Sequence, residues 1–172
     1  MGRLQGRTEE TVNASAARIW DVLVDPSRLP EWVTVVERVT AHAEREQAGS
    51  VRRCEVAMDG RRGYMVERCL ESVPERRLRH AVEDDSLGFT KMFRDYSFTL
   101  ELEPRGQDAT LVTCKTFYDP RTISARLMNA LVMRRRFASV RQDILRGLKD
   151  IVEAIPPPAA HSQRPSANSA VA

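Results

Sequence analysis

Arg94 and Tyr96 are the residues whose types and spacing first suggest chemistry. They are two positions apart, so their side chains share one face if the segment is a β-strand. A guanidinium stays charged, and its planar fork can hold a carboxylate, phenolate or enolate. A phenol beside it can donate or relay a proton, so the pair can stabilise an enolate. In the alternative interpretation Arg94 extends to water at an open rim, and Tyr96 is a core residue with a satisfied hydroxyl.

Both residues belong to an alternating run that predicts a strand over Thr90–Glu103, and a second such run follows at Thr110–Tyr118. Polar residues such as Glu101 and Lys115 occupy the alternate positions, so the apolar face of each strand should point inward. The inward residues predicted as ligand contacts on these strands are Met92, Phe98, Cys114, Thr116 and Tyr118. A wall of aromatic side chains with a few converging polar groups is typical of a ligand pocket.

Metal and nucleotide chemistry is not predicted. The three cysteines, Cys54, Cys69 and Cys114, are odd in number and far apart, so they form neither a disulfide framework nor a metal knuckle. No two histidines or cysteines have metal spacing, and no glycine loop could cradle a phosphate. His80 can face inward on its strand, where we expect a structural hydrogen bond. We therefore expect no metal and no cofactor, and a reducing cytoplasm is the predicted location.

The remaining elements follow from periodicity and turn residues. A helix is predicted over Ala14–Val24 with Ser15 as its N-cap, and a second short helix over Pro26–Glu31. Further strands are predicted at Thr8–Val12, Thr34–Ala41, Gly49–Met58, Gly63–Val73 and Arg77–Glu83. The strands are joined by tight turns such as Asp59-Gly60, which favours an antiparallel meander over βαβ units.

A long amphipathic helix is predicted to begin at Asp119-Pro120 and to run to about Ile155. Its apolar stripe beyond Met133 consists of Phe137, Val140, Ile144, Leu148, Ile151 and Ile155. The element order predicts an α+β fold, in which a curved antiparallel sheet of about seven strands wraps around this helix. Residues 156–172 are rich in Pro, Ala and Ser, and we expect a disordered tail there.

The chain has 172 residues, 42% apolar and 30% charged, a composition typical of one soluble globular domain. Residues 121–153 hold eight basic and three acidic side chains, a net charge of +5, whereas residues 1–120 have a net charge of −3. Acidic residues are interspersed among the arginines of the basic segment, and no aromatic platform accompanies them. We therefore expect a solvated helix face, with no nucleic-acid partner and no stable membrane association. The N-terminus lacks an apolar signal core, so export is not expected.

The element order, together with the segments Asn13–Leu23 and Leu29–Trp32, resembles the START-like helix-grip (SRPBCC) superfamily. The most similar branch is the polyketide cyclase/dehydrase group of small bacterial proteins, with further matches at Glu71–Leu78 and Phe98–Pro104. The resemblance covers about residues 6–155. It implies one helix-grip domain with a cavity between the sheet and the long helix, which holds an apolar or aromatic ligand.

The resemblance also implies which face of the Gly63–Val73 strand is inward. It places Met65, Glu67 and Cys69 inside, with Glu67 as a polar wall residue that pairs with Arg94. Several cyclases have an arginine at or next to the position of Cys69. Here the inward residue is Cys69, and Arg68 lies beside it on the opposite face of the strand. A slip of one residue would exchange the two faces. Alternatively, the charged residues near the strand end face solvent.

Three further ligand contacts are expected, two of them implied by the resemblance. Trp32 is expected at the cavity edge, where it can stack on a ligand. Leu127 and Leu131 lie in the first turns of the last helix, which roofs the cavity mouth in the family. A kink or a separate short helix is the alternative for these turns.

Two functions remain open from the sequence. In the first, the protein is a polyketide cyclase, aromatase or dehydrase that acts on an apolar substrate, with Arg94, Tyr96 and Glu67 as catalytic residues. In the second, it is a noncatalytic carrier of a lipid, quinone or other hydrophobic ligand. Convergence of Arg94, Tyr96 and one residue of the Glu67–Arg68 pair would favour the enzyme. A homodimer is also left open.

Overall fold

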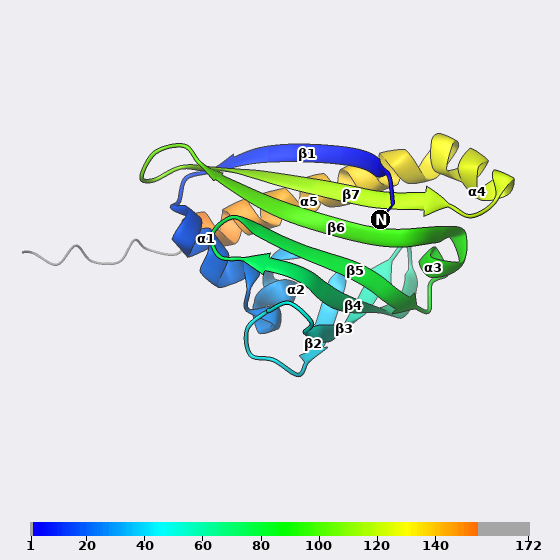
Figure 1. The fold of residues 1–172 in the computed structure, drawn as a ribbon, viewed down its shortest axis with the longest axis horizontal. Coiled ribbons are helices and arrows are strands. Elements are labelled where there is room, and N and C mark those ends of the chain that lie inside the picture. Colours follow the sequence, from blue (N-terminus) through cyan, green and yellow to red (C-terminus); the bar gives the residue numbers. More distant parts are fainter. Residues whose placement is uncertain (1, 155–172) are drawn as a thin grey trace, which may run out of the picture.

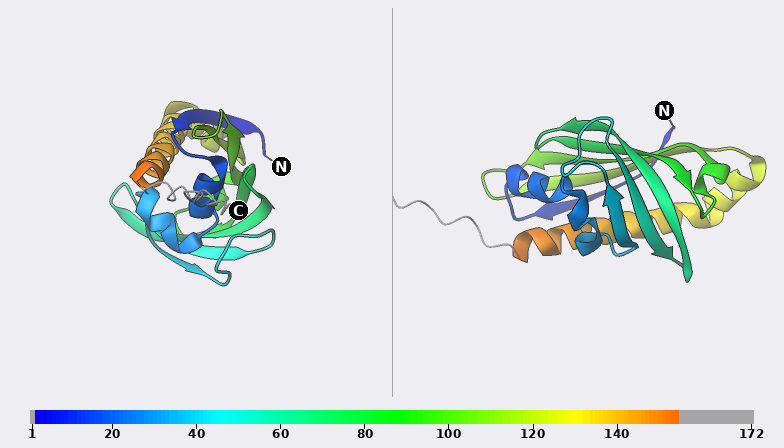
Figure 2. Two further views of the ribbon diagram at one scale, coloured as in Figure 1. Left: turned by 90° about the vertical axis from the view of Figure 1, so that its left-hand side faces the viewer. Right: turned by 90° about the horizontal axis from the view of Figure 1, so that it is seen from below.

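Seven strands form a single antiparallel sheet in the order β1-β7-β6-β5-β4-β3-β2. The structure is a computed structural model, and it describes residues 2–154. The strands are β1 (Leu4–Val12), β2 (Val36–Ala41), β3 (Val51–Met58), β4 (Arg61–Val73), β5 (Arg77–Asp85), β6 (Phe93–Pro104) and β7 (Thr110–Pro120). The sheet is long and curved (Figure 1), and the end-on view in Figure 2 shows helices on its concave side.

The helices close the open side of the sheet. Their bounds are α1 (Ala16–Leu23), η1 (Pro26–Arg28), α2 (Leu29–Trp32), α3 (Phe89–Met92), α4 (Ile123–Met128), the π-helical turn η2 (Asn129–Met133) and α5 (Arg134–Ala154). The last three follow one another without a break and make up the long C-terminal helix. The predicted α+β fold, a curved antiparallel sheet around this helix, is confirmed.

The C-terminal helix begins later than predicted. Asp119 and Pro120 are the last residues of β7. The side chain of Thr122 then caps α4 by accepting a hydrogen bond from the Ala125 N–H at 3.1 Å. The helix therefore starts at Ile123, because a capping hydroxyl, and not the proline, defines its first turn.

Two predictions fall outside the described residues: the helix end near Ile155 and the disordered tail over 156–172. Of the helices that the structure describes, none is both long enough and apolar enough to cross a bilayer.

α5 buries a stripe that shares Phe137 and Leu148 with the predicted one and is rotated toward Arg141. Its buried residues are Phe137, Arg141, Leu145, Leu148 and Val152. Val140, Ile144 and Ile151 are only partly buried. The buried face is thus turned toward Arg141, which fits against β1 because its neighbour there is the glycine Gly6.

β6 begins later than predicted, and this changes which side chains face inward. Residues 89–92 form α3, because the Asp85 carboxylate accepts hydrogen bonds from the first backbone N–H groups of that turn. A β-bulge then follows Arg94, with Asp95 at φ 54°. A bulge adds one residue and shifts the alternation of side chains. Phe93 is therefore buried and Arg94 is exposed, so the inward position predicted for Arg94 is wrong.

α5 approaches α2 closely at Gly147. A Cβ at this position would overlap with the backbone carbonyl of Trp32. Trp32 is itself buried, so the close approach holds α2 against α5 at one side of the sheet. Only glycine permits this distance, although it is an unfavourable residue for a helix interior.

Gly147→Ala is expected to lower the free energy of unfolding by about 1–3 kcal/mol, because the added methyl group must push α2 away from α5. Helix propensity alone predicts the opposite, a gain of about 1 kcal/mol. Urea unfolding measures the difference, with the exposed Gln142→Ala on the same helix as a control that stays within about 0.5 kcal/mol of wild type. A stabilised Gly147→Ala variant would show that the two helices do not meet in this way.

Candidate functional site

The concave face of the sheet, α2 and α5 enclose a cavity of about 100 Å³. Most of its wall is apolar. The apolar lining residues are Leu23, Leu29, Trp32, Val33, Val35, Val36, Val56, Met58, Met65, Leu78, Val82, Phe89, Phe98, Leu100, Phe137, Val140 and Ile144. The polar lining residues are Arg52, Glu67, His80, Tyr96, Cys114, Thr116 and Arg141. An apolar wall with a few polar groups is the composition of a small-molecule site.

The volume limits what the cavity can hold. Sites for drug-sized ligands measure roughly 300–1,000 Å³. An engineered cavity of about 150 Å³ binds benzene. This cavity is smaller than the one that binds benzene, so even a ligand with a single substituted ring requires α5 or α2 to move away from the sheet.

Arg52 is the centre of a buried charge network on one wall. Its partner across the β3–β4 hairpin is Glu67, so both side chains leave the sheet on the same face. Arg52 Nε donates to Glu67 Oε2 at 2.8 Å, and Arg52 Nη1 donates to Glu46 Oε1 at 3.1 Å. All three residues are buried. Two carboxylates share one guanidinium, which leaves one negative charge unbalanced unless a neighbour takes up a proton.

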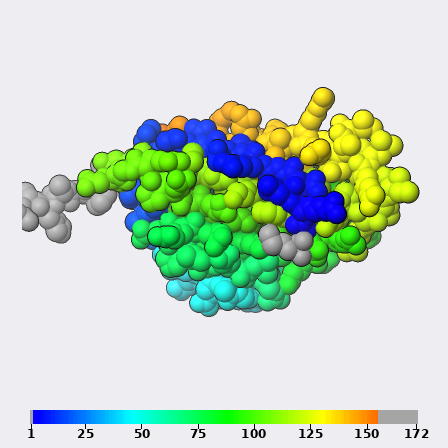
Figure 3. All heavy atoms as spheres, turned by 45° about the horizontal axis from the view of Figure 1, so that its top comes forward, coloured from blue at the N-terminus to red at the C-terminus, as the bar shows by residue number. Residues whose placement is uncertain are grey.

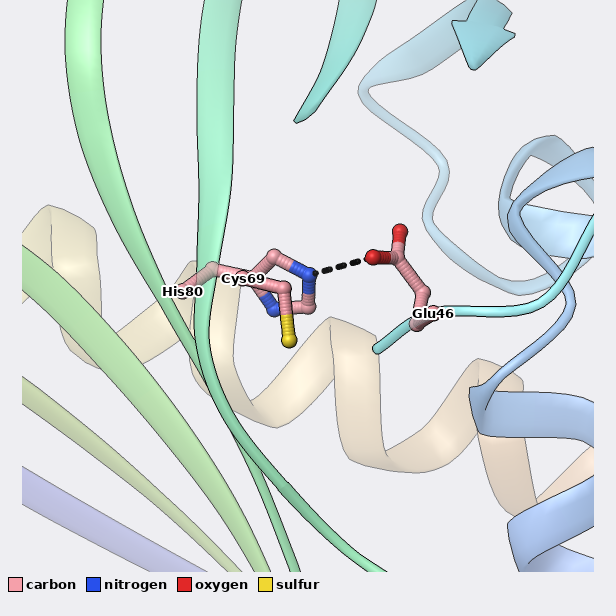
Figure 4. A group of neighbouring side chains, drawn as sticks. All are labelled: Glu46, Cys69 and His80. Carbon is pink, nitrogen blue, oxygen red and sulfur yellow. Dashed lines mark ion pairs between the residues drawn. The ribbon is translucent and has the colours of Figure 1, made fainter. Parts of the chain in front are cut away.

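His80 on β5 extends this network (Figure 4). Its Nε2 lies 3.2 Å from Glu46 Oε2, without the alignment of a hydrogen bond. Burial and the nearby charge of Arg52 lower the pKa of His80, so the imidazole is neutral near pH 7. Burial alone would raise the pKa of Glu46, but the contact with His80 and the charge of Arg52 lower it to about 2. Because the imidazole is neutral, we attribute this lowering chiefly to Arg52.

Glu46, Cys69 and His80 bring three potential metal-ligand atoms within 4.8 Å of one another, as Figure 4 shows. Zinc takes ligands of these types. However, Glu46 already accepts hydrogen bonds from Ser50 and from Arg52, whose positive charge repels a cation. Burial also raises the pKa of the Cys69 thiol to about 11, which disfavours the thiolate that a metal needs. We therefore interpret the group as a charge network.

Arg141 occupies the wall formed by α5, β1 and β7. Its Nε donates to Thr8 Oγ1 at 3.1 Å, and its Nη1 donates to Thr116 Oγ1 at 3.3 Å. The residue is only 6% exposed. Within residues 2–154, no carboxylate lies at ion-pair distance from this guanidinium.

Tyr96 on β6 contributes a phenol to the cavity. Burial and the nearby Glu67 carboxylate raise its pKa, so the phenol remains protonated at neutral pH. Its ring packs on Phe137 at 5.6 Å and on Tyr118 at 5.9 Å between ring centroids. The Tyr118 hydroxyl donates to Asn129 Oδ1 at 2.6 Å, which ties the π-helical turn to the sheet. This aromatic cluster anchors the start of α5 beside the cavity.

Many of the predicted site residues do line the cavity, namely Trp32, Met65, Glu67, Tyr96, Phe98, Cys114 and Thr116. Cys69 and Tyr118 are buried but do not reach the cavity surface, and Met92 packs against the core from α3. Their part in ligand binding or catalysis stays a prediction. Met65, Glu67 and Cys69 are predicted to face inward from β4, and all three are buried.

The predicted partnership of Glu67 with Arg94 is wrong. Arg94 lies outside the cavity because of the bulge in β6, and Glu67 pairs with Arg52 instead. Arg68 also points away from the cavity and forms an ion pair with Glu83 at 2.5 Å. The expected convergence of Arg94 with Tyr96 is therefore absent from the described cavity, although Tyr96 and Glu67 both line it.

Leu127 and Leu131 do not roof the cavity. They are 61% and 65% exposed, because α4 and η2 extend past the end of the sheet. In the space-filling view of Figure 3, this yellow segment forms one end of the molecule beyond β1. Leu131 lines a separate, more open hollow against β3. The alternative of a separate short helix describes this part, since the π-helical turn η2 divides α4 from α5.

Sequence reasoning did not select Arg52, Glu46 or Arg141 as site residues. A usable signal existed for the first, since the predicted turn at Asp59-Gly60 fixes the hairpin register and sets Arg52 opposite Glu67. Glu46 lies in a charged loop between β2 and β3, where no periodicity applies. Arg141 resembled the many surface arginines of the helix, and only its tertiary neighbours distinguish it.

Arg52→Met is expected to lower the free energy of unfolding by about 3–5 kcal/mol near neutral pH, because two buried carboxylates lose their cation. This loss should shrink as the pH falls below about 4.5, because wild type itself then loses the stabilisation that the Glu46 carboxylate provides. In wild type the pKa of Glu46 is lowered from 4.5 to about 2, so the stabilisation from this carboxylate is present above pH 4.5 and is lost as the pH falls toward 2. Urea unfolding at several pH values measures both trends.

Arg53→Met is the matched control. Arg53 is the exposed neighbour of Arg52, and its guanidinium lies 3.6 Å from the centroid of the Tyr64 ring. Its replacement should cost about 1 kcal/mol or less. Equal losses in the two variants would contradict the buried network.

The sequence of the chain matches a known family. The family described as polyketide cyclase / dehydrase and lipid transport matches residues 3–153. A search of curated proteins found no match.

Three solved structures illustrate the shared fold. TTHA0849 from Thermus thermophilus is 24% identical with a TM-score of 0.69, over 86% of this chain and 96% of that chain. A START superfamily protein from Mycobacterium smegmatis is 15% identical with a TM-score of 0.69, over 86% and 96%. The Zhui aromatase/cyclase from Streptomyces sp. R1128 is 18% identical with a TM-score of 0.68, over 86% and 92%. The chain has the START-like helix-grip fold and belongs to the polyketide cyclase / dehydrase and lipid transport family.

Proposed function

We propose that this protein is a noncatalytic binding protein that holds a small hydrophobic molecule with an aromatic ring in the cavity beneath α5. The observation that carries the proposal is the cavity itself: it is lined by aromatic and aliphatic side chains and has a few fixed polar groups. The description of the family as including lipid transport supports a carrier. The cytoplasmic location and the absence of a nucleic-acid partner remain predictions.

The structure also offers the ligand an unused hydrogen-bond donor. Among the described residues, the buried indole Nε1 of Trp32 has no hydrogen-bond partner, and Trp32 lines the cavity. A buried donor without a partner costs free energy, which a ligand oxygen would recover. Trp32 is therefore proposed as a contact that both stacks on a ligand and donates to it.

Catalysis is a second candidate, favoured by one observation. Tyr96 and Glu67, two of the predicted catalytic residues, line the same cavity. A protonated phenol and a buried carboxylate can serve as acid and base in a cyclisation or dehydration. The similar Streptomyces protein is named as an aromatase/cyclase, which fits this interpretation. The third predicted catalytic residue, Arg94, lies outside the cavity and does not contribute to this catalytic interpretation.

A neutral single-ring compound, 4-ethylbenzamide, is expected to bind wild type with a Kd of about 0.1–1 mM. Binding should shift the indole N–H NMR signal of Trp32 far more than that of Trp20, because only Trp32 lines the cavity. Val140→Phe should weaken binding at least about tenfold by filling the space with a second ring. Val132→Phe, on the exposed surface of η2, is the matched control and should bind as wild type does.

Equal shifts of both indole signals, or unchanged binding by Val140→Phe, would contradict a ligand site in this cavity. The carrier and the enzyme are separated by the fate of the bound compound. When a linear poly-β-ketone is incubated with the protein, a carrier leaves the rate of its spontaneous cyclisation no faster than in a control without protein. Ring formation that depends on Tyr96 and Glu67 would instead establish the enzyme.

A further inference from the structure

Arg141 is a buried cation whose charge no neighbouring carboxylate of the described residues neutralises. It lines the cavity, and its hydrogen bonds go to two neutral hydroxyls, those of Thr8 and Thr116. A buried ion without a partner of opposite charge costs several kcal/mol in desolvation. A guanidinium has five N–H donors in a planar fork, and these two bonds leave the others free to bind an acceptor.

The carboxylates of β1 and of the opposite cavity wall are engaged with other groups. On β1, Glu9 accepts a hydrogen bond from the Thr113 hydroxyl at 3.1 Å and pairs with Arg7, and Glu10 accepts a hydrogen bond from Lys149 at 2.7 Å. In the cavity, Glu67 pairs with Arg52. None of these groups forms an ion pair with Arg141, so a bound anion would supply the counter-charge that the described residues do not.

The residues of β1 and β7 around Arg141 leave space for its guanidinium and fix its orientation. Gly6 lies against the Arg141 side chain, and a Cβ at this position would overlap with the guanidinium group. A register shift in the pairing of β1 with β7, between Leu4 and Gly6, places the glycine there. Thr8 and Thr116 then fix the orientation of the planar group from two neighbouring strands.

The two walls of the cavity differ in charge. On the wall of β3, β4 and β5, the carboxylates of Glu46 and Glu67 share the single cation Arg52. An anionic group placed beside that wall would be repelled. On the wall of α5, β1 and β7, Arg141 supplies an unshared positive charge.

We propose that Arg141 binds the carboxylate of an aromatic carboxylic acid, whose ring occupies the apolar part of the cavity. This deepens the proposed function and rests on it. The Thr116 and Thr8 hydroxyls position the guanidinium, and the carboxylate accepts charge-assisted hydrogen bonds from its fork. The negatively charged wall that contains Glu67 sets the orientation of the ligand, because it repels the carboxylate and so favours its binding at Arg141.

A matched ligand pair tests the inference. 4-Ethylbenzoate and 4-ethylbenzamide have nearly the same shape and differ in charge at neutral pH. Wild type should bind the acid at least about tenfold more tightly than the amide. In Arg141→Gln this ratio should fall to about one. Arg135→Gln removes an exposed arginine of the same helix and should keep the wild-type ratio.

A ratio that survives in Arg141→Gln, or that is lost in Arg135→Gln, would overturn the inference. If Arg141→Gln does not fold, the Nε–H NMR signal of Arg141 in wild type decides the matter, since it should shift with the acid and not with the amide. An unchanged signal on saturation with the acid would overturn the inference. Failure of both compounds to bind would instead refute the ligand cavity, and with it the proposed function.

Discussion

The burial of three charged side chains in one wall of the cavity is the constraint on which the rest of the structure depends. Each ion loses several kcal/mol of hydration on burial, so each must be held by another. Arg52 meets this need for Glu46 and Glu67 together. Because Glu46 lies in the loop between β2 and β3, its bond to Arg52 also holds that loop over the sheet. The backbone bonds of Gly49 and Ser50 with Cys69 reinforce the same contact.

The opposite wall depends on close approach more than on charge pairing. α5 lies against β1 where Gly6 leaves room for Arg141, and against α2 where Gly147 leaves room for a backbone carbonyl. The Tyr118–Asn129 hydrogen bond joins the π-helical turn to β7 just before α5 begins. π-helical turns often occur at functional sites. Here the turn divides the exposed α4, which precedes it in the chain, from α5, which packs against the sheet.

The sequence was sufficient for the architecture, because alternation, turn residues and a long amphipathic segment each reflect local rules. It also placed Glu67 and Tyr96 in the cavity wall. It failed for Arg94, since a bulge at Asp95 and a capped turn at Asp85 are not visible in a period of two. It failed for Arg141 because the burial of an arginine depends on a glycine 135 positions earlier in the chain. Tertiary approach, and not local pattern, selects these residues.

The central claim is that a small, mostly apolar cavity with one unpaired cation among the described residues holds the acid group of an aromatic ligand. A crystal structure of the protein with 4-ethylbenzoate tests it most directly. The account predicts the ring beside Phe98 and Phe137, with the carboxylate about 3 Å from the Arg141 guanidinium. A carboxylate bound at Arg52 instead, or a ligand found only in the open hollow near Leu131, would contradict it.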